Sequence, residues 1–278
     1  MSRFKRLFIK LRMTNILRIL LQKEAFVFRN FNDLLNSNLK NVCMEITSNK
    51  IHINQTDVKN TKLFSVVMNT QNFDEYELNG VDKLNIGFNI NHLYKIFKIL
   101  KKKDSLELVI EADNPKELII RIKDRENPSK VTESSIQVQD MQIIDPELPT
   151  GYDNVFNVKS ADYQKFIKAT RDITSKNIRV TSTSTRLDFA YDMSNIIKRK
   201  TTFGDATTKN DNILYSDEFD MKDINKTVKL SNISSYINIY TKQDMPIRLE
   251  SDIGTFGNLN IYIKSKKMLE LESNSIES

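Results

Sequence analysis

The sequence has little of what cross-linked, metal-binding or catalytic proteins use. It contains one cysteine and two histidines in 278 residues, which excludes a disulfide framework and any metal site built from several cysteines. Glycine-rich phosphate loops, GxSxG elbows and HExxH zinc motifs are all missing from it. We therefore expect no enzyme, no metal and no cofactor.

Glycine, proline and long apolar runs are also scarce. Six glycines and five prolines are too few for a disordered chain. The best apolar run, residues 16–21, is far shorter than the about 20 residues that cross a bilayer. With 39% apolar and 28% charged residues, the composition is that of a soluble globular protein with room for two domains.

Positive charge is in modest excess, and it is concentrated at the start of the chain. The 42 lysines and arginines outnumber 36 acidic residues, which gives a net charge of +6 and permits a polyanionic partner. Residues 1–12 hold five basic side chains and no acid, with an apolar stripe at helical spacing. Three interpretations stay open for them: a mitochondrial transit peptide, a basic arm, or an inert extension before an internal start at Met13.

Hydrophobic periodicity predicts an α+β chain of short strands and few helices. Helices are expected over 24–37, from Asn91 to beyond Leu100, over 161–175, and from Asn232 to Lys242. The stretch 198–211, rich in Thr, Lys, Asn and Asp, predicts an exposed loop. Strands are expected at 15–21, 42–46, 51–53, 63–68, 76–79, 106–110, 118–122, 178–181, 187–191, 247–250 and 259–263.

The order of helices and strands in the first half recurs in the second half. This predicts two similar α+β domains in tandem. The stretch between them, 141–152, contains Pro146 and Pro149 and has no periodicity, which indicates a linker. The expected boundaries are an N-terminal extension at 1–12, a first domain at 13–138, a linker at 139–153, a second domain at 154–266 and a C-terminal tail at 267–278.

The polar faces of two predicted helices carry the clearest functional signal. Lys95, Lys98 and Lys102 fall at helical spacing opposite an apolar stripe, and a second basic group follows within 165–171. Basic helix faces can hold a phosphate backbone without reading bases. From the residues alone, a merely solvated face remains the alternative.

A set of short stretches occurs in the order found in one known family. No single stretch is diagnostic, but with the duplicated layout and the length they make the chain resemble sliding clamps of the proliferating cell nuclear antigen (PCNA) type, from Met13 to about Lys266. The stretches are Cys43–Ser48, Asn72–Tyr76, Leu84–Asn89, Tyr94–Lys98, Asp113–Asn114, Leu148–Pro149, Arg171–Ile173, Tyr236–Lys242, Asp244–Pro246 and Gly257–Tyr262.

The resemblance implies a homotrimeric ring around double-stranded DNA, with two clamp domains in each subunit, helices inside and antiparallel sheets outside. Such a clamp tethers DNA polymerase and other replication and repair proteins that carry a clamp-binding motif. It has no catalysis and no membrane partner, and an ATP-dependent clamp loader opens it. The Asn-, Ile- and Lys-rich composition suggests a large DNA virus or a protist, hence the nucleus or a viral replication site.

The resemblance also assigns residues by position. The first predicted helix has Asn30 and Asn36 where the family has lysines, so its share of DNA contact is smaller, and Arg18 and Arg29 are the weaker candidates. The expected DNA-binding residues are Arg18, Arg29, Lys95, Lys98, Lys102, Lys165, Lys168, Arg171 and Lys242.

A pocket for a partner peptide is expected beneath the linker. The chain departs from the family at Lys264 and Ser265, where Ala-Pro is usual, and at Asn60, where animal clamps have His, so a different peptide preference is expected. The matching positions are Thr56, Asn60, Leu63, Leu148, Pro149, Tyr152, Pro246 and Tyr262.

The ring is expected to close by strand addition between two edge strands, at 132–138 and 193–198. The interface residues implied are Thr132, Ser134, Ile136, Val138, Met193, Asn195 and Ile197. Three other functions stay open: one subunit of a heterotrimeric checkpoint-type clamp, a monomeric viral processivity factor, and a nuclease or transferase concealed in an α+β fold.

Overall fold

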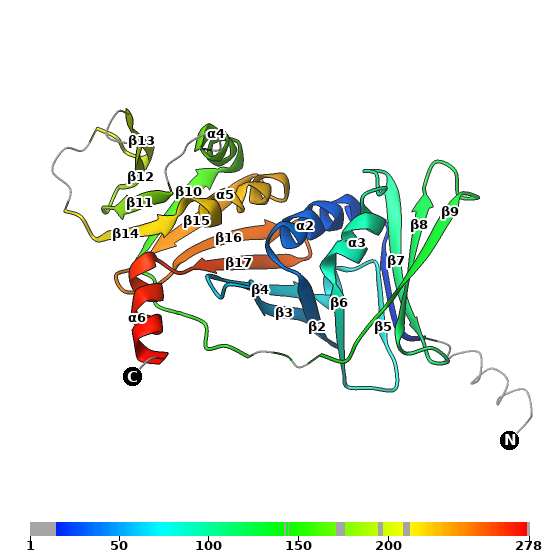
Figure 1. The fold of residues 1–278 in the computed structure, drawn as a ribbon. Helices are drawn as coiled ribbons and strands as arrows, with labels where there is room; N and C mark the ends of the chain where they lie inside the picture. Colours follow the sequence, from blue (N-terminus) through cyan, green and yellow to red (C-terminus); the bar gives the residue numbers. More distant parts are fainter. Residues whose placement is uncertain are drawn as a thin grey trace, which may run out of the picture. The chain divides into compact units, whose positions relative to one another are not determined.

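The computed structural model describes residues 15–141, 143, 145–170, 176–193, 197–207 and 212–276 (Figure 1). The chain forms two compact units. The first unit contains the chain up to Gln55, then Val66–Asp145 and Ile253–Asn258; the second contains Thr56–Ser65, Pro146–Asp252 and the chain from Leu259 onward. The two units are therefore not consecutive along the chain. Thr56–Ser65, from the first half of the sequence, belongs to the second unit, and Ile253–Asn258, from the second half, belongs to the first.

The first unit is built on a five-stranded antiparallel sheet with the order β5-β1-β7-β8-β9. A second group of strands, in the order β6-β2-β3, is also antiparallel. The bounds are β1 Asn15–Leu21, β2 Asn41–Thr47, β3 Lys50–Thr56, β5 Glu75–Leu78, β6 Lys83–Asn89, β7 Asp104–Glu111, β8 Glu117–Asp124 and β9 Val131–Gln137, with a 3-10 turn η1 at Thr70–Asn72. Strand β4, Lys62–Asn69, begins in the second unit and ends in the first.

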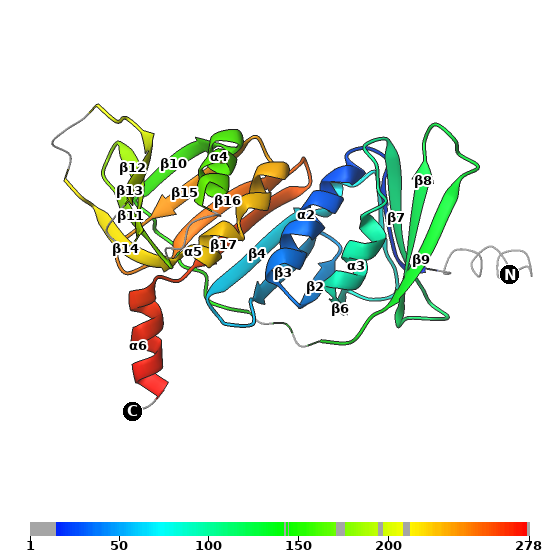
Figure 2. The ribbon, with the colours of Figure 1, turned by 45° about the horizontal axis from the view of Figure 1, so that its top comes forward.

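Helices α2 (Ala25–Asn38) and α3 (Ile90–Phe97) lie side by side in the first unit (Figure 2). The core beneath them includes the ring contacts of Phe28 with Phe73 and Phe256. Helix α3 begins one residue earlier than expected, because the side chain of Asn89 accepts a hydrogen bond from the Asn91 amide at 3.0 Å and caps the helix.

The second unit contains a four-stranded antiparallel sheet, β13-β12-β11-β14, and a second strand group in the order β10-β15-β16-β17. On helix α4, Phe166 packs against Phe189 and Phe203 of the four-stranded sheet. The bounds are β10 Asn154–Lys159, α4 Ser160–Thr170, β11 Asn177–Ser182, β12 Arg186–Met193, β13 Ile197–Gly204, β14 Tyr215–Asp220, α5 Met221–Asn225, η2 Val228–Asn232, β15 Tyr236–Thr241, β16 Ile247–Ile253, β17 Gly257–Ile263 and α6 Lys266–Ile276.

Two expectations are wrong in the second unit. The segment from Asn232 to Lys242 is not a helix: Ile237, Ile239 and Thr241 are buried at alternate positions of β15, so the period of two prevails over the helical spacing. The expected loop at 198–211 contains most of strand β13.

Most of the predicted tail at 267–278 forms helix α6. This helix begins after Ser265, whose hydroxyl accepts a hydrogen bond from the Met268 amide at 3.3 Å.

The predicted linker at 139–153 is attached at its start to the first unit. Gln139 and Gly87 of β6 exchange backbone hydrogen bonds of 2.7 and 2.8 Å. A side chain on Gly87 would lie 2.2 Å from the sulfur of Met141, so glycine is required for Met141 to pack there. The first linker residues thus continue the sheet edge at β6.

Candidate nucleic-acid interface and partner surface

The lysines predicted on the second helix lie on and just beyond α3, directed away from the core. Ile90, Leu93 and Phe97 are buried, and Lys95, Lys98 and Lys102 are exposed. Within the described part of the chain, these three ammonium groups have no ion-pair partner. Their charge is therefore available to an external anion.

Helix α4 places its lysines in the same way in the second unit. Its buried face includes Tyr163, whose hydroxyl lies 2.7 Å from the hydroxyl of Thr227. On the opposite face, the Lys165 side chain is 80% exposed and lies 3.6 Å from Asp162, and Lys168 donates to the Gln164 side chain at 2.9 Å. Arg171 lies outside the described residues.

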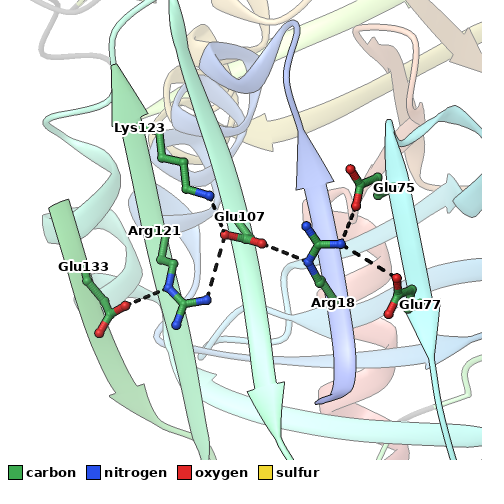
Figure 3. Close-up of polar contacts among 7 residues, drawn as sticks. All are labelled: Arg18, Glu75, Glu77, Glu107, Arg121, Lys123 and Glu133. Atoms are coloured by element: carbon green, nitrogen blue, oxygen red, sulfur yellow. Dashed lines mark hydrogen bonds and ion pairs between the residues drawn. The ribbon is translucent and has the colours of Figure 1, made fainter. Parts of the chain in front are cut away.

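Two of the arginines proposed for DNA contact are occupied by other groups. Arg18 lies on strand β1, and Glu75, Glu77 and Glu107 surround its guanidinium (Figure 3). Arg29 lies on α2, donates to the Leu100 carbonyl at 3.1 Å and covers a phenylalanine ring. These contacts leave both arginines with less capacity for phosphate than the lysines of α3 and α4.

Lys242 also has a different setting from the one expected. It follows strand β15, because the helix predicted to carry it does not form. Its ammonium donates to the Gly151 carbonyl at 2.6 Å and lies 3.5 Å from an Asp153 carboxylate oxygen. Lys242 thus holds the end of the linker in the second unit, and its predicted DNA contact loses the helical placement on which it depended.

Arg18 belongs to an ion-pair ladder that crosses all five strands of the first unit's main sheet (Figure 3). At its centre, the Glu107 carboxylate is only 6% exposed and lies 2.9 Å from both Arg18 and Lys123, and 3.9 Å from Arg121. The ladder ends at the sheet edge, where Arg121 reaches Glu133 of β9 at 2.7 Å. We call this set of seven residues the outer ladder; its members are Arg18, Glu75, Glu77, Glu107, Arg121, Lys123 and Glu133.

The outer ladder shifts the pKa values of Glu107 and Arg18. Burial alone would raise the pKa of Glu107, but hydrogen bonds from Lys123 and Arg18 outweigh it, and the pKa lies below the usual value. The hydrogen bond to Glu107 raises the pKa of Arg18. The ladder lies on the sheet face opposite the buried side chains of Leu17 and Ile19, because successive residues of a strand point to opposite faces.

Three of the eight predicted partner-pocket residues are brought together in the second unit. The Tyr152 hydroxyl donates to the Pro246 carbonyl at 2.8 Å. Burial, with the adjacent Tyr262, raises the pKa of Tyr152. The other five, Thr56, Asn60, Leu63, Leu148 and Pro149, belong to the same unit, and Asn60 adopts a left-handed backbone with φ of 55° in the β3–β4 turn.

Sequence reasoning missed the residues that support Tyr152. The guanidinium of Arg248 lies 3.8 Å from the ring centre of Tyr240 and 5.3 Å from that of Tyr152. Glu250 accepts a hydrogen bond from Tyr240 and lies 3.5 Å from Arg248. The signal available was the alternation of β16, which puts Arg248 and Glu250 on one face.

The described residues provide no metal site and no membrane span. Within the ranges given above, no three His, Cys, Asp or Glu side chains cluster as metal ligands. No described helix is long and apolar enough to cross a membrane. Cys43 is buried, donates to the Met141 carbonyl at 3.5 Å, and has its pKa raised by burial.

Residues 17–147 match the family model described as "Proliferating cell nuclear antigen, N-terminal domain". The first half of the chain is thus similar to the N-terminal domain of the PCNA family. It is 22% identical over 258 residues to the "Probable DNA polymerase sliding clamp 1" of Paramecium bursaria Chlorella virus 1, which covers 90% of this chain and 97% of that relative. It is 23% identical over 234 residues to "DNA polymerase sliding clamp 1" of Pyrobaculum aerophilum, covering 78% and 86%.

The solved structures include a close match in fold. The crystal structure of proliferating cellular nuclear antigen from Entamoeba histolytica matches with a TM-score of 0.78 and 17% identity, covering 91% of this chain and 99% of that one. This match confirms the predicted α+β clamp fold with antiparallel sheets and few helices. At this identity the likeness concerns the fold alone.

Of the two stretches predicted to join subunits, the first lies on an edge strand and the second is divided between two strands. Strand β9, which carries Thr132, Ser134 and Ile136, is the last strand of its sheet, with Val138 just beyond it. In the second unit the edge strand is β13, which begins at Ile197, whereas Met193 ends the inner strand β12. Met193 and Ile197 therefore belong to two different strands, and Asn195 lies outside the described residues.

Proposed function

We propose that the chain is a DNA sliding clamp, a processivity factor without catalysis of its own. The observation that carries the proposal is the exposed basic face of α3 in one unit and of α4 in the other. Many weak contacts from lysines to phosphates hold a duplex without fixing its position, which sliding requires. The relatives named as DNA polymerase sliding clamps support the same function.

The proposal extends to assembly, partners and location. Three copies close head to tail into a ring around double-stranded DNA through β9 and β13. DNA polymerase and other proteins with a clamp-binding motif dock near Tyr152, Pro246 and Tyr262, and an ATP-dependent loader opens the ring. The chain acts where DNA is replicated, in the nucleus or at a viral replication site. The edge strands and the basic faces support this arrangement.

Charge reversal on the basic faces tests the function. We expect Lys95→Glu, Lys98→Glu, Lys165→Glu and Lys168→Glu, combined in one variant, to shorten polymerase products on a primed template by at least about tenfold, because binding to DNA weakens with every lysine that no longer neutralises a phosphate. The solution mass of the variant, measured by light scattering, should equal that of the wild type.

A matched control separates this effect from net charge. Reversal of four other lysines, Lys40, Lys50, Lys116 and Lys159, which are exposed and lie on neither α3 nor α4, makes the same change in net charge and should leave product length within about twofold of the wild type. Unchanged processivity in the four-lysine variant, with its mass and fold intact, would exclude these faces as the DNA-contacting surface.

A further inference from the structure

The turn between β3 and β4 carries Asn60, one of the residues predicted for the partner pocket, and belongs to the second unit. Asn60 is exposed and has a left-handed backbone, which a residue other than glycine keeps only where its surroundings determine it. The Thr61 carbonyl accepts a hydrogen bond from the Lys264 amide at 2.9 Å, directly after strand β17, which carries Tyr262. The shape of this turn therefore determines how Asn60 is presented at the predicted pocket.

One carboxylate holds the turn together from inside. Oδ1 of Asp57 accepts hydrogen bonds from the Thr61 and Lys62 amides at 2.8 and 3.0 Å. Oδ2 of the same carboxylate accepts one from the Thr61 hydroxyl at 3.0 Å. The backbone closes the same loop, because the Asn60 amide donates to the Asp57 carbonyl at 3.0 Å. The orientation of this buried carboxylate therefore sets the shape of the turn.

The positive charge that faces Asp57 is the ammonium of Lys62. The Lys62 side chain is 0% exposed, and its Nζ lies 3.4 Å from Oδ2 of Asp57. The same ammonium donates to the carboxylate of Asp223 on α5, 161 residues further along the chain. Because a buried charge without partners is costly, the fold keeps both carboxylates close to it. Lys62 thus connects a local turn to a distant helix.

Helix α5 is itself fixed within the second unit. Ile224 is buried, and the side-chain oxygen of Asn225 accepts a hydrogen bond from the Thr170 hydroxyl of α4 at 2.6 Å. Asp223 lies between these two anchored residues. It therefore gives Lys62 a partner whose position does not depend on the turn.

We propose that Lys62 is a positioning residue of the partner site. Held by Asp223, its ammonium fixes the carboxylate of Asp57. That carboxylate shapes the turn that presents Asn60, so a bound peptide meets a preformed surface and loses no affinity to ordering it. The inference rests on the partner docking in the proposed function, and it assigns a role to a side chain too deeply buried for a peptide to touch.

Binding of a fluorescein-labelled synthetic peptide that carries a clamp-binding motif, followed by fluorescence anisotropy, tests the positioning. We expect Asp223→Asn to weaken binding at least about fivefold, because the peptide must then order the turn. Asp223→Glu keeps a carboxylate for Lys62 and should stay within about twofold of the wild type. The matched control Lys59→Met removes an exposed ammonium from the same turn and should also stay within about twofold.

A second variant separates positioning from stability. Lys62→Met combined with Asp223→Leu replaces the buried ion pair by apolar side chains, a change that often preserves stability. Urea unfolding should give nearly the wild-type free energy, and the peptide should still bind at least about fivefold more weakly. By nuclear magnetic resonance, the Thr61 amide should exchange its hydrogen at least about tenfold faster, whereas the amides of β12 keep wild-type rates.

A double-mutant cycle tests whether Lys62 acts through the turn. In an Asn60→Ala background, Asp223→Asn should weaken the peptide by less than about twofold, because the contact that the turn presents is already lost. Equal weakening in both backgrounds would show that the ion pair acts elsewhere and would overturn the inference.

The outcomes separate this inference from the proposed function. A wild type that binds the peptide, with every variant at wild-type affinity, would overturn the positioning role and leave the partner site intact. A loss with Lys59→Met equal to that with Asp223→Asn would assign the effect to charge and also overturn it. A wild type that does not bind the peptide would overturn the partner site together with this inference, whereas the basic faces are judged separately by the processivity assay.

Discussion

In the first unit, the side chain of Asn32 on α2 is buried, and among the described residues neither its amide nitrogen nor its oxygen has a hydrogen-bond partner. It borders an apolar cavity of about 40 Å³ together with Phe31, Leu35 and other core residues. In the second unit, Lys62 is also almost wholly buried, but its ammonium is paired with Asp57 at 3.4 Å and with Asp223 of α5.

The two sites, Asn32 and Lys62, therefore differ in how completely the buried polar group is paired. A buried amide without a hydrogen-bond partner lowers the free energy of unfolding by about 1–3 kcal/mol, which a folded unit can tolerate. A buried charge without a partner lowers it several times more, so Lys62 requires its two carboxylates. Asp57 is itself held by the amides of Thr61 and Lys62 at 2.8 and 3.0 Å, and these hydrogen bonds lower its pKa although burial raises it.

Removing a partner of Lys62 should have the largest effect on stability. We expect Asp223→Asn to lower the free energy of unfolding by about 3–5 kcal/mol, because it leaves a buried ammonium with a single carboxylate, that of Asp57 at 3.4 Å. Urea unfolding measures the change. Asp162→Asn, which removes an exposed carboxylate 3.6 Å from Lys165, is the control and should change stability by less than about 0.5 kcal/mol; equal effects would mean that Lys62 does not depend on the pair.

Neutralising the centre of the outer ladder should have the next largest effect. Glu107→Gln leaves Arg18 and Lys123 without their shared carboxylate, so we expect a loss of about 2–3 kcal/mol at pH 7. Because the pKa of Glu107 is lowered by folding, the unfolded chain binds more protons, and stability from this group is complete above about pH 4.5 and is lost as pH falls through the folded pKa.

Unfolding of the wild type and of Glu107→Gln across pH 3–7 checks this sign. The difference between their free energies of unfolding should become smaller as the pH falls. Glu126→Gln, which removes a 68% exposed partner of Lys103, should unfold with nearly the wild-type free energy at every pH. A difference between wild type and Glu107→Gln that is constant with pH would contradict the assigned pKa shift.

Filling the cavity in the first unit should have the smallest effect, and in the opposite direction. Asn32→Leu removes two unpaired polar atoms and adds apolar contact, so we expect the free energy of unfolding to rise by about 1–2 kcal/mol. Asn38→Leu on the same helix is the matched control, since its amide donates to the Leu34 carbonyl at 2.9 Å. If Asn32→Leu destabilises the protein as much as the control does, the side chain of Asn32 has hydrogen-bond partners in solution.

Periodicity in the sequence predicted most strands and helices but not their limits. Strand β1 at 15–21 and the alternation of β8 were predicted correctly, because β8 has one face in the core. Strand β7 was also predicted, but residues on both of its faces are buried. Strand β15 was taken for a helix because Ile233, Tyr236, Ile237 and Tyr240 fit the helical spacing as well. In the second unit, α5 instead begins after Asp220, whose side chain accepts from the Lys222 amide at 2.7 Å.

The candidate site was predictable only in part. Lys95, Lys98 and Lys165 follow from helical spacing, which is local. Whether a basic residue is free depends on its neighbours in space: Arg18 is held by Glu107, 89 residues away. The cation–ring contact of Arg248 with Tyr152 joins segments that no local pattern connects.

By itself, the sequence determined the α+β class, the alternation of the strands, the basic helix faces and the lack of a clustered catalytic motif, because each depends on residues a few positions apart. Only the tertiary structure decided which charged side chains form ion pairs inside the chain and which lie exposed on an edge strand. Lys62 meets Asp223 across 161 residues, whereas Glu133 lies on the edge strand β9, 57% exposed, beside Arg121. Such pairings are set by which strands and helices pack together, and burial then makes an unpaired charge too costly to keep.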